Sequence, residues 1–275
     1  MTDRTDTKGS VNTGDTRSFI KPDLAKEYVR DVLERWTDPG VLFIDPAAGQ
    51  GAFAAPLGQS GRRLRAVDPD PRIRGMKPRE FLEAPNIFGG GESPTVVVGS
   101  PPFGRNAGAI VKYFNYAAHH GADGIAFVVP RSFRKPSVQK RLDAMYHLQV
   151  DRDVPRNAFL RDGGSHDVAC AWQVWTRGDS ERVVREPPNV DHLISYTTPD
   201  LAEFAVRRAG HGAGGVVTGD IGSLATASHY FLREERDGVR EALEGTDWSD
   251  VVGQTAGIPS LSKGEIAFRL GEIFG

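Results

Sequence analysis

The chain has 275 residues, of which 39% are hydrophobic and 25% charged, as in an ordinary globular protein with one large domain and room for an appendage. No apolar run approaches the ~20 residues that a membrane-spanning helix needs, and residues 1–17 lack the apolar stretch of a secretory signal, so we expect a cytoplasmic protein without a membrane partner. The formal net charge of −2 does not by itself support nucleic-acid binding.

The order of predicted elements follows from hydrophobic periodicity. Residues 1–17 are polar and are expected to form a disordered leader, and a helix is predicted from about Pro22 to Trp36. Apolar runs of strand length follow, each bounded by Gly, Pro or Asp. The predicted strands are 41–44, 64–67, 95–99 and 124–129. Another helix is predicted at about 107–119.

The later part of the chain is expected to add an antiparallel pair of strands. After a basic helix near 138–145, strands at 147–151 and 168–176 are predicted to form an edge hairpin with a long loop. Residues 178–188 are charged and contain Pro, which is typical of a linker. Short strands and one or two helices are expected in residues 190–275.

This alternation predicts an α/β fold with a doubly wound, mostly parallel sheet, an antiparallel edge hairpin and a small C-terminal α+β extension. The expected division is a leader at 1–17, a main domain at 18–178 and an extension at 179–275. The charge divides in the same way. Residues 101–177 carry eleven Lys/Arg against six Asp/Glu, whereas residues 200–275 carry seven against twelve. A polyanion would therefore bind to the middle of the chain.

A Gly-rich turn follows the first predicted strand. It reads Asp45, Pro46, Ala47, Ala48, Gly49, Gln50, Gly51. Glycines at a strand-to-helix turn let a ligand approach the backbone, and Asp68, which ends the next strand, could accept hydrogen bonds from both hydroxyls of a ribose. The pair indicates a nucleoside cofactor, although a tight turn without ligand is the alternative for the glycines alone. Ala54 replaces the third Gly of a pyrophosphate-binding loop.

The turn after residues 95–99 is the more specific signal. It reads Ser100, Pro101, Pro102, Phe103, Gly104. Two prolines directly after a buried strand end its pairing and fix a rigid backbone that presents a short polar side chain and an aromatic ring. A stiff β-turn without function is the alternative for the prolines alone.

The two turns together resemble the motifs of the amino-methyltransferase superfamily, in the order found in its gamma group. The resemblance covers residues 19–177. It implies a Rossmann-like fold, S-adenosylmethionine as the cofactor with S-adenosylhomocysteine as the product, and no metal. It also implies a nucleic-acid partner, DNA in preference to RNA, in an enzyme of bacterial or phage type.

The resemblance also implies roles for individual residues. Lys21 and Pro22 match an N-terminal motif beside the cofactor, and Glu80 matches an acid that receives the adenine amine. The implied cofactor set is Lys21, Pro22, Asp45, Ala47, Gly49, Gly51, Asp68, Glu80 and Ser100.

The implied catalytic residues are Ser100, Pro101, Pro102 and Phe103. The Ser100 hydroxyl and the Pro101 carbonyl can each accept a hydrogen bond from an aryl amine, which localises the nitrogen lone pair for attack, while Phe103 stacks on the base. The motif order and Phe103 favour adenine-N6, whereas Ser100 is commoner in cytosine-N4 enzymes.

A cluster of basic residues follows the strand at 124–129. Arg131, Phe133, Arg134 and Lys135 are predicted to contact nucleic acid, with a solvated charged face as the alternative. Residues 179–275 are interpreted equally as a target-recognition region or a lid. RNA methylation, protein glutamine methylation and a non-catalytic nucleic-acid-binding relative remain open.

Overall fold

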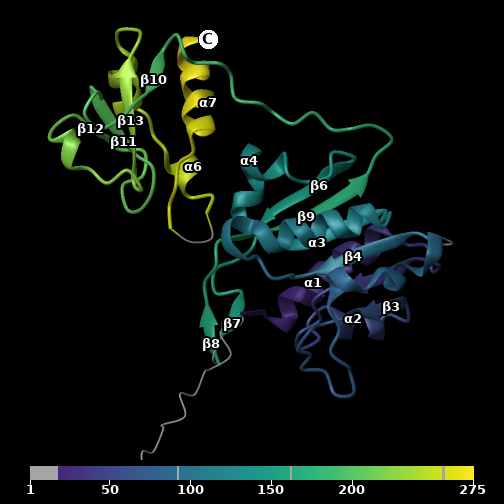
Figure 1. The fold of residues 1–275 in the computed structure, drawn as a ribbon. Coiled ribbons are helices and arrows are strands. Elements are labelled where there is room, and N and C mark those ends of the chain that lie inside the picture. Colours follow the sequence, from purple (N-terminus) through teal and green to yellow (C-terminus); the bar gives the residue numbers. More distant parts are fainter. Residues whose placement is uncertain (1–17, 92, 162, 256–257) are drawn as a thin grey trace, which may run out of the picture.

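The computed structural model describes residues 18–91, 93–161, 163–255 and 258–275, so the expected leader at 1–17 lies outside the described residues. The chain folds into a main body built on a large sheet and a smaller C-terminal part, joined by an extended linker (Figure 1).

The main body contains a six-stranded sheet with the order β3-β2-β4-β5-β9-β6. Its strands are β2 (Leu42–Asp45), β3 (Arg63–Ala66), β4 (Thr95–Gly99), β5 (Gly124–Pro130), β6 (Tyr146–Asp153) and β9 (Cys170–Arg177). The first four strands in the sheet order are parallel, and β9 runs antiparallel to both of its neighbours. The expected mixed α/β fold is confirmed, and β9 and β6 form an antiparallel pair at one edge of the sheet.

Both faces of this sheet are covered, which explains why its central strands are apolar throughout. Helices α1 (Pro22–Arg35) and α2 (Ala54–Gln59) pack on the face that carries Val96 and Val98. Helix α3 (Gly108–His119) and the short 3₁₀ helices η1 (Phe81–Glu83) and η2 (Pro85–Gly91) cover the face that carries Val97. Cys170, the single cysteine of the sequence, is fully buried, and burial raises its thiol pKa to about 12.

The expected basic helix at 138–145 is wrong. After the 3₁₀ helix η4 (Arg131–Arg134), helix α4 spans only Pro136–Gln139. The side chain of Asn115 then holds a turn, because it donates to the carbonyl of Arg141 at 2.7 Å and accepts from the amide of Asp143 at 2.9 Å. These contacts from α3 end the helix before β6.

The segment between β6 and β9 was expected to be a loop, but it contains two strands. Strands β7 (Phe159–Arg161) and β8 (Gly164–His166) form a hairpin, and β1 (Phe19–Ile20) pairs with β7 to complete a small sheet. Phe19 is opposite Leu160, and Ile20 is opposite Phe159. This small sheet brings the start of the described chain to the carboxyl end of the main sheet.

The C-terminal part has its own antiparallel sheet, with the order β10-β13-β11-β12. Its strands are β10 (Ile194–Tyr196), β11 (Phe204–Arg207), β12 (Val216–Val217) and β13 (His229–Glu234). Among the described residues its helices are η5 (Ile221–Ser223), α5 (Val239–Glu244), α6 (Ser249–Val252) and α7 (Lys263–Phe274), so one or two helices was an underestimate. A separate apolar core, drawn from residues 190–270, lies between this sheet and the helices.

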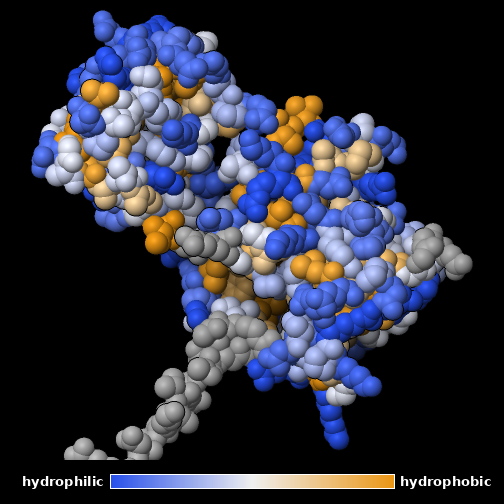
Figure 2. All heavy atoms as spheres, viewed as in Figure 1, coloured by the Kyte–Doolittle hydropathy of each residue, from blue (hydrophilic) through white to orange (hydrophobic). Residues whose placement is uncertain are grey.

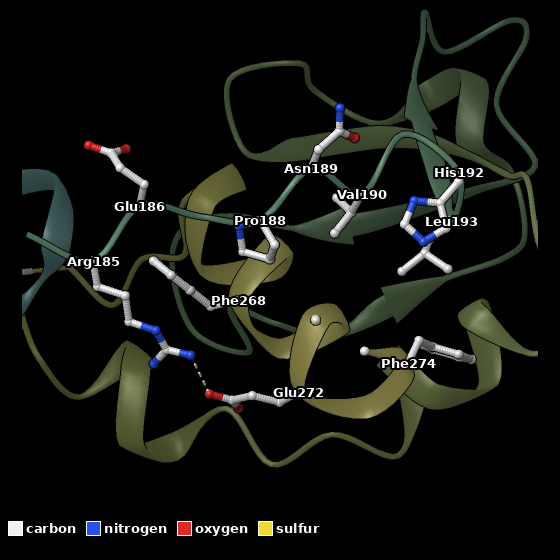
Figure 3. A pocket seen from close by; sticks show the side chains of 12 residues that line it. Arg185, Glu186, Pro188, Asn189, Val190, His192, Leu193, Phe268, Glu272 and Phe274 are labelled. Carbon is white, nitrogen blue, oxygen red and sulfur yellow. Dashed lines mark hydrogen bonds and ion pairs between the residues drawn. The ribbon is translucent and has the colours of Figure 1, made fainter.

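Two contacts fix the C-terminal part. The linker packs across α7, where Arg185 pairs with Glu272 at 3.2 Å around a cavity of about 360 Å³ (Figure 3). On the side facing the main body, the Lys135 ammonium lies 2.9 Å from the Glu265 carboxylate and donates to the Ser260 carbonyl at 3.0 Å. Lys135 and Glu265 are both less than a tenth exposed, so this ion pair is part of the packed junction.

Candidate active site

The two turns singled out in the sequence face one cavity of about 310 Å³. Parallel strands end at the same edge of a sheet, and the ends of β2, β3 and β4 meet there. The cavity is lined by Ser18, Phe19, Ala47, Gly49, Asp68, Pro69, Ser100, Pro101, Pro102, Phe103, Tyr113, Phe159 and Val168. The structure therefore brings together seven of the twelve predicted catalytic and cofactor residues, although they are spread from Ala47 to Phe103 in the chain.

The Gly-rich turn is shaped by Gly49. Its backbone is left-handed, with a φ of 51°, and its amide donates a 2.8 Å hydrogen bond to Asp68 Oδ2. A Cβ atom at this position would lie 3.0 Å from the ring of Phe19, so the missing side chain lets the ring close over the turn. Gly51 also has a positive φ but does not line the cavity, and it serves to complete the turn.

Asp68 presents an oriented carboxylate to the cavity. It is 5% exposed, and its second oxygen accepts a 2.8 Å hydrogen bond from the amide of Asp70. A carboxylate can accept hydrogen bonds at both of its oxygens. The carboxylate is thus fixed by the backbone and suited to two neighbouring hydroxyl groups.

Asp45 lies directly behind the cavity and is fully buried. Its Oδ1 accepts a 3.2 Å hydrogen bond from the Ala47 amide, whereas its Oδ2 has no hydrogen-bond partner. Burial raises the pKa of Asp45 to about 7, and the nearby Asp68 carboxylate contributes to the rise. Gly99 permits this packing, because a Cβ there would lie 2.9 Å from Asp45 Oδ1.

The Ser100–Gly104 turn contributes both polar and aromatic groups. Ser100 is half-buried at the end of β4, and Phe103 packs edge-on against Phe159 with the ring centroids 6.5 Å apart. The Phe103 carbonyl accepts a 3.2 Å hydrogen bond from the Ala109 amide at the start of α3. The turn is therefore anchored at both ends, by β4 and by α3.

Besides Asp45 and Gly51, three more predicted cofactor residues lie outside the cavity lining. Lys21 and Pro22 begin α1, with Lys21 as the N-cap, and the amide of Lys21 donates to the Ala158 carbonyl at 2.8 Å. Glu80 accepts a 2.9 Å hydrogen bond from the hydroxyl of Tyr113, which does line the cavity. Glu80 thus orients Tyr113, and burial together with this hydrogen bond raises the pKa of the Tyr113 hydroxyl.

Several aromatic residues at the cavity were not identified from the sequence. Phe19 directly precedes the N-terminal motif, and Tyr113 lies on the predicted helix at 107–119, so both had a local signal. Phe159 had none beyond being an aromatic residue in a polar loop. Its position depends on the β1–β7 pairing, which joins segments far apart in the chain.

The predicted basic rim is largely engaged within the protein. Arg131 pairs with Asp153 at 2.9 Å, and Arg134 pairs with Asp151 at 2.8 Å and with Asp153 at 2.7 Å. Lys135 forms an ion pair with Glu265 at the junction. Phe133 is fully buried, so its ring cannot stack on a ligand, and the prediction that it contacts nucleic acid is corrected on this ground.

Within the residues that the structure describes, no group of three or more His, Cys, Asp or Glu side chains is arranged to hold a metal ion. None of the helices in this part of the chain has the length and apolar character needed to cross a membrane.

No protein-family model matches the chain, and no curated protein sequence matches it. Similar solved structures include a Vibrio vulnificus protein assigned as a modification subunit of a type I restriction enzyme, with 16% identity over 61% of this chain and a TM-score of 0.43. This chain spans 46% of that protein's length.

A second similar structure is a Pyrococcus horikoshii protein assigned as an RNA methyltransferase, with 14% identity, coverage of 57% of this chain and 85% of that chain, and a TM-score of 0.39. An Escherichia coli protein assigned as a methyltransferase matches with 17% identity, coverage of 55% and 87%, and a TM-score of 0.33. All three TM-scores are below 0.5, so the function is inferred from the cavity and its residues.

Proposed function

We propose that this protein transfers a methyl group from S-adenosylmethionine to the exocyclic amine of a nucleic-acid base, with adenine-N6 in DNA as the favoured target. The observation that carries the proposal is that Gly49 and Asp68 line the same 310 Å³ cavity as the turn Ser100–Phe103. Gly49 and Asp68 suit a nucleoside, and the turn suits an aromatic amine. Their proximity is what a two-substrate transfer reaction requires.

The residues present fit this cofactor. Asp68 would accept hydrogen bonds from its ribose hydroxyls, while Gly49 lets the ligand approach the backbone and Tyr113 borders the same space. The Asp45 carboxylate, with one buried and unpartnered oxygen, would hold the positively charged amino-acid end by charge and hydrogen bonding. Lys21, Pro22, Ala47, Gly51 and Glu80 would support these groups from the surrounding turns.

The chemistry of the catalytic turn follows from its polar atoms. The Ser100 hydroxyl and the Pro101 carbonyl would each accept a hydrogen bond from the substrate amine, which concentrates its lone pair for attack. When bound, S-adenosylmethionine supplies a methyl group on a positively charged sulfur. In such a transfer the amine nitrogen would take the methyl group, the sulfur would keep the electron pair of the broken S–CH₃ bond, and the extra amine proton would leave to solvent.

Phe103 would hold the base against this turn by stacking, and Pro102 fixes the backbone between the two. Phe103 is half-buried and braced by Phe159, so its ring is oriented before a substrate arrives. Ser100 in place of an amide or carboxylate keeps cytosine-N4 as a second candidate target. Ser100 is the specific observation that favours it.

The experiment that tests the proposal is incubation with methyl-labelled S-adenosylmethionine and, separately, double-stranded DNA, single-stranded DNA and RNA. Mass spectrometry of the digested nucleosides identifies the product. N6-methyladenine in DNA supports the main proposal. N4-methylcytosine in DNA would identify cytosine as the target base, and label in RNA alone would identify RNA as the substrate. The absence of both transfer and cofactor binding contradicts it and favours a non-catalytic relative.

A further inference from the structure

A second and larger cavity, of about 900 Å³, lies between the main body and the C-terminal part. One wall comes from the catalytic turn, η4 and the end of α4, with Phe103 and Arg141, and the other carries Arg208 and Tyr230. Figure 2 shows the surface hollowed between the two lobes. Phe103 and Val168 line this cleft and the 310 Å³ cavity alike, so the two spaces meet at Phe103.

The cleft continues away from the catalytic turn. A third cavity, of about 380 Å³, shares Ser137 and Tyr230 with the cleft and extends to Lys140 and Lys263. The three spaces therefore lie in series, with Phe103 at the first junction and Tyr230 at the second. A series of connected cavities of this kind suits an extended, chain-like ligand.

The charge of the cleft is opposite to that of the whole chain. Six Lys/Arg side chains line the cleft and the third cavity. Lys135, Lys140 and Arg185 form ion pairs with Glu265, Glu186 and Glu272, whereas Arg141, Arg208 and Lys263 form no ion pair with any residue that the structure describes. The cations are Lys135, Lys140, Arg141, Arg185, Arg208 and Lys263. Residues 200–275 are acidic overall, yet Arg208 and Lys263 face these cavities. This distribution indicates an anionic ligand along the cleft.

The cations of the C-terminal wall are combined with aromatic rings. The Arg208 guanidinium lies 4.9 Å from the centroid of the Tyr230 ring, and Lys263 Nζ lies 3.9 Å from that of Tyr196. The two rings are packed edge to face, 5.7 Å apart. Arg208 and Tyr230 both line the cleft, and a cation beside an aromatic ring suits a nucleotide, which presents a phosphate and a flat base.

We infer that this cleft binds one unpaired strand of nucleic acid, with phosphates held between Arg141 and Arg208 and the target base passing Phe103 into the catalytic cavity. The inference rests on the proposed function and names its substrate as a single strand. The cleft has about three times the volume of the cavity assigned to one nucleoside cofactor, which is room for a few nucleotides of one strand. The Lys135–Glu265 ion pair lines the cleft and joins its two walls directly.

Arg208 can be tested against its own neighbour in the chain. Arg207 donates a hydrogen bond to the His211 carbonyl at 3.2 Å and lies outside the cleft lining, whereas Arg208 lies within it. The variants R207Q and R208Q therefore remove the same charge from adjacent positions. R141Q removes a cation from the opposite wall, which tests the cleft without altering the Arg208–Tyr230 contact.

The measurement is fluorescence anisotropy of the full chain with a short labelled single-stranded DNA, the same sequence as RNA, and the matching DNA duplex, over a series of salt concentrations. We expect a single strand to bind at least about 10-fold more tightly than the duplex. Comparison of the affinities for the DNA and RNA strands shows which sugar is preferred. R208Q and R141Q should each reduce the dependence of log K on log salt by about 1, since each removes one phosphate contact, while R207Q should match the wild type.

If R207Q and R208Q changed the salt dependence of strand binding equally and R141Q left it unchanged, the cleft assignment would be overturned. If the duplex bound as tightly as the single strand, the single-strand assignment would be overturned. Neither result bears on methyl transfer, which is assayed separately. Strand binding that depends on Arg208 without any methyl transfer would support the cleft and contradict the proposed function instead.

Discussion

The amide of Gly49 donates a hydrogen bond to the carboxylate of Asp68, 2.8 Å away and 19 positions later in the chain. This bond ties the turn after β2 to the end of β3 and aims the carboxylate into the candidate cofactor cavity. It acts together with two backbone hydrogen bonds between the same segments, from the Ala48 amide to the Val67 carbonyl at 3.0 Å and from the Arg72 amide to the Gly49 carbonyl at 2.8 Å.

Replacing Asp68 with Ala should weaken S-adenosylmethionine binding by about 100-fold, because hydrogen bonds to a charged group contribute ~1.5–3 kcal/mol. Isothermal titration calorimetry measures the change. The matched control is D70N, since the Asp70 carboxylate is 63% exposed and pairs with Arg72 at the surface. Equal affinities for D68A and D70N would contradict the assignment of Asp68.

Replacing Phe103 with Ala should lower kcat/KM by about 10- to 100-fold, since stacking of a base on an aromatic ring is worth ~1–3 kcal/mol. Cofactor affinity should stay within about threefold of the wild type, because the polar contacts proposed for the cofactor come from other residues. F103Y keeps the ring and should retain most of the activity. A parallel loss of cofactor binding in F103A would show that Phe103 belongs to the cofactor site.

Asp45 predicts a particular dependence of stability on pH. Its pKa is raised from 3.8 to about 7 in the folded protein, so between these values the folded state keeps a proton that the unfolded state releases. Stability from this group is therefore full below about pH 4, falls as the pH rises, and levels off above about pH 7. D45N removes this contribution.

The measurement for Asp45 is the free energy of unfolding of D45N minus that of the wild type, taken from urea titrations without cofactor across this pH range. This difference should become more positive from pH 4 to pH 7, by roughly 4 kcal/mol at most, because the wild type loses stability over this range whereas D45N does not. A difference that does not change with pH would show that Asp45 titrates at its ordinary pKa.

Gly99 should not tolerate a methyl group. A Cβ there would lie 2.9 Å from Asp45 Oδ1 and 3.2 Å from Pro46 Cδ, so G99A should cost ~1–3 kcal/mol of stability and weaken cofactor binding. Thermal unfolding and calorimetry report the two effects. G219A is the control, because a Cβ at Gly219 meets nothing within 4 Å.

The buried pair of Lys135 and Glu265 predicts non-additive substitutions. K135M leaves the Glu265 carboxylate buried without its partner and should cost ~3–5 kcal/mol of stability. E265Q can still serve the capping box at the start of α7, where Ser262 and residue 265 bond reciprocally. The double variant K135M/E265Q should therefore recover part of the lost stability. The measurement is a double-mutant cycle on the free energy of unfolding in urea, and additive effects of the two substitutions would contradict the coupling of the pair.

The sequence predicted the parts of the fold that depend on local signals. Strands β2, β4 and β5 are continuous apolar runs ended by Asp45, Ser100 and Pro130, so both their positions and the turns that follow were identified. The helix expected at 138–145 failed because Asn115, on another helix, fixes a turn in the middle of it.

The rest of the site depends on long-range packing that periodicity does not reveal. Phe159 reaches the cavity through pairing of β7 with β1, and Arg131 and Arg134 after β5 form ion pairs with Asp151 and Asp153 on β6. A run of cations in a sequence does not show which carboxylates pair with it in the folded chain. Likewise, the sequence does not show that Arg208 lines the cleft whereas its neighbour Arg207 does not.

The junction at Lys135 has a consequence for the order in which the protein matures. The carbonyl that accepts its hydrogen bond belongs to Ser260, 125 residues later, so Lys135 can meet its partners only after residues 260–265 have been synthesised. The main sheet and the lining of the candidate cofactor cavity lie wholly before residue 178, so they can form earlier during synthesis. The two walls of the proposed cleft would therefore be joined only after that cavity has formed.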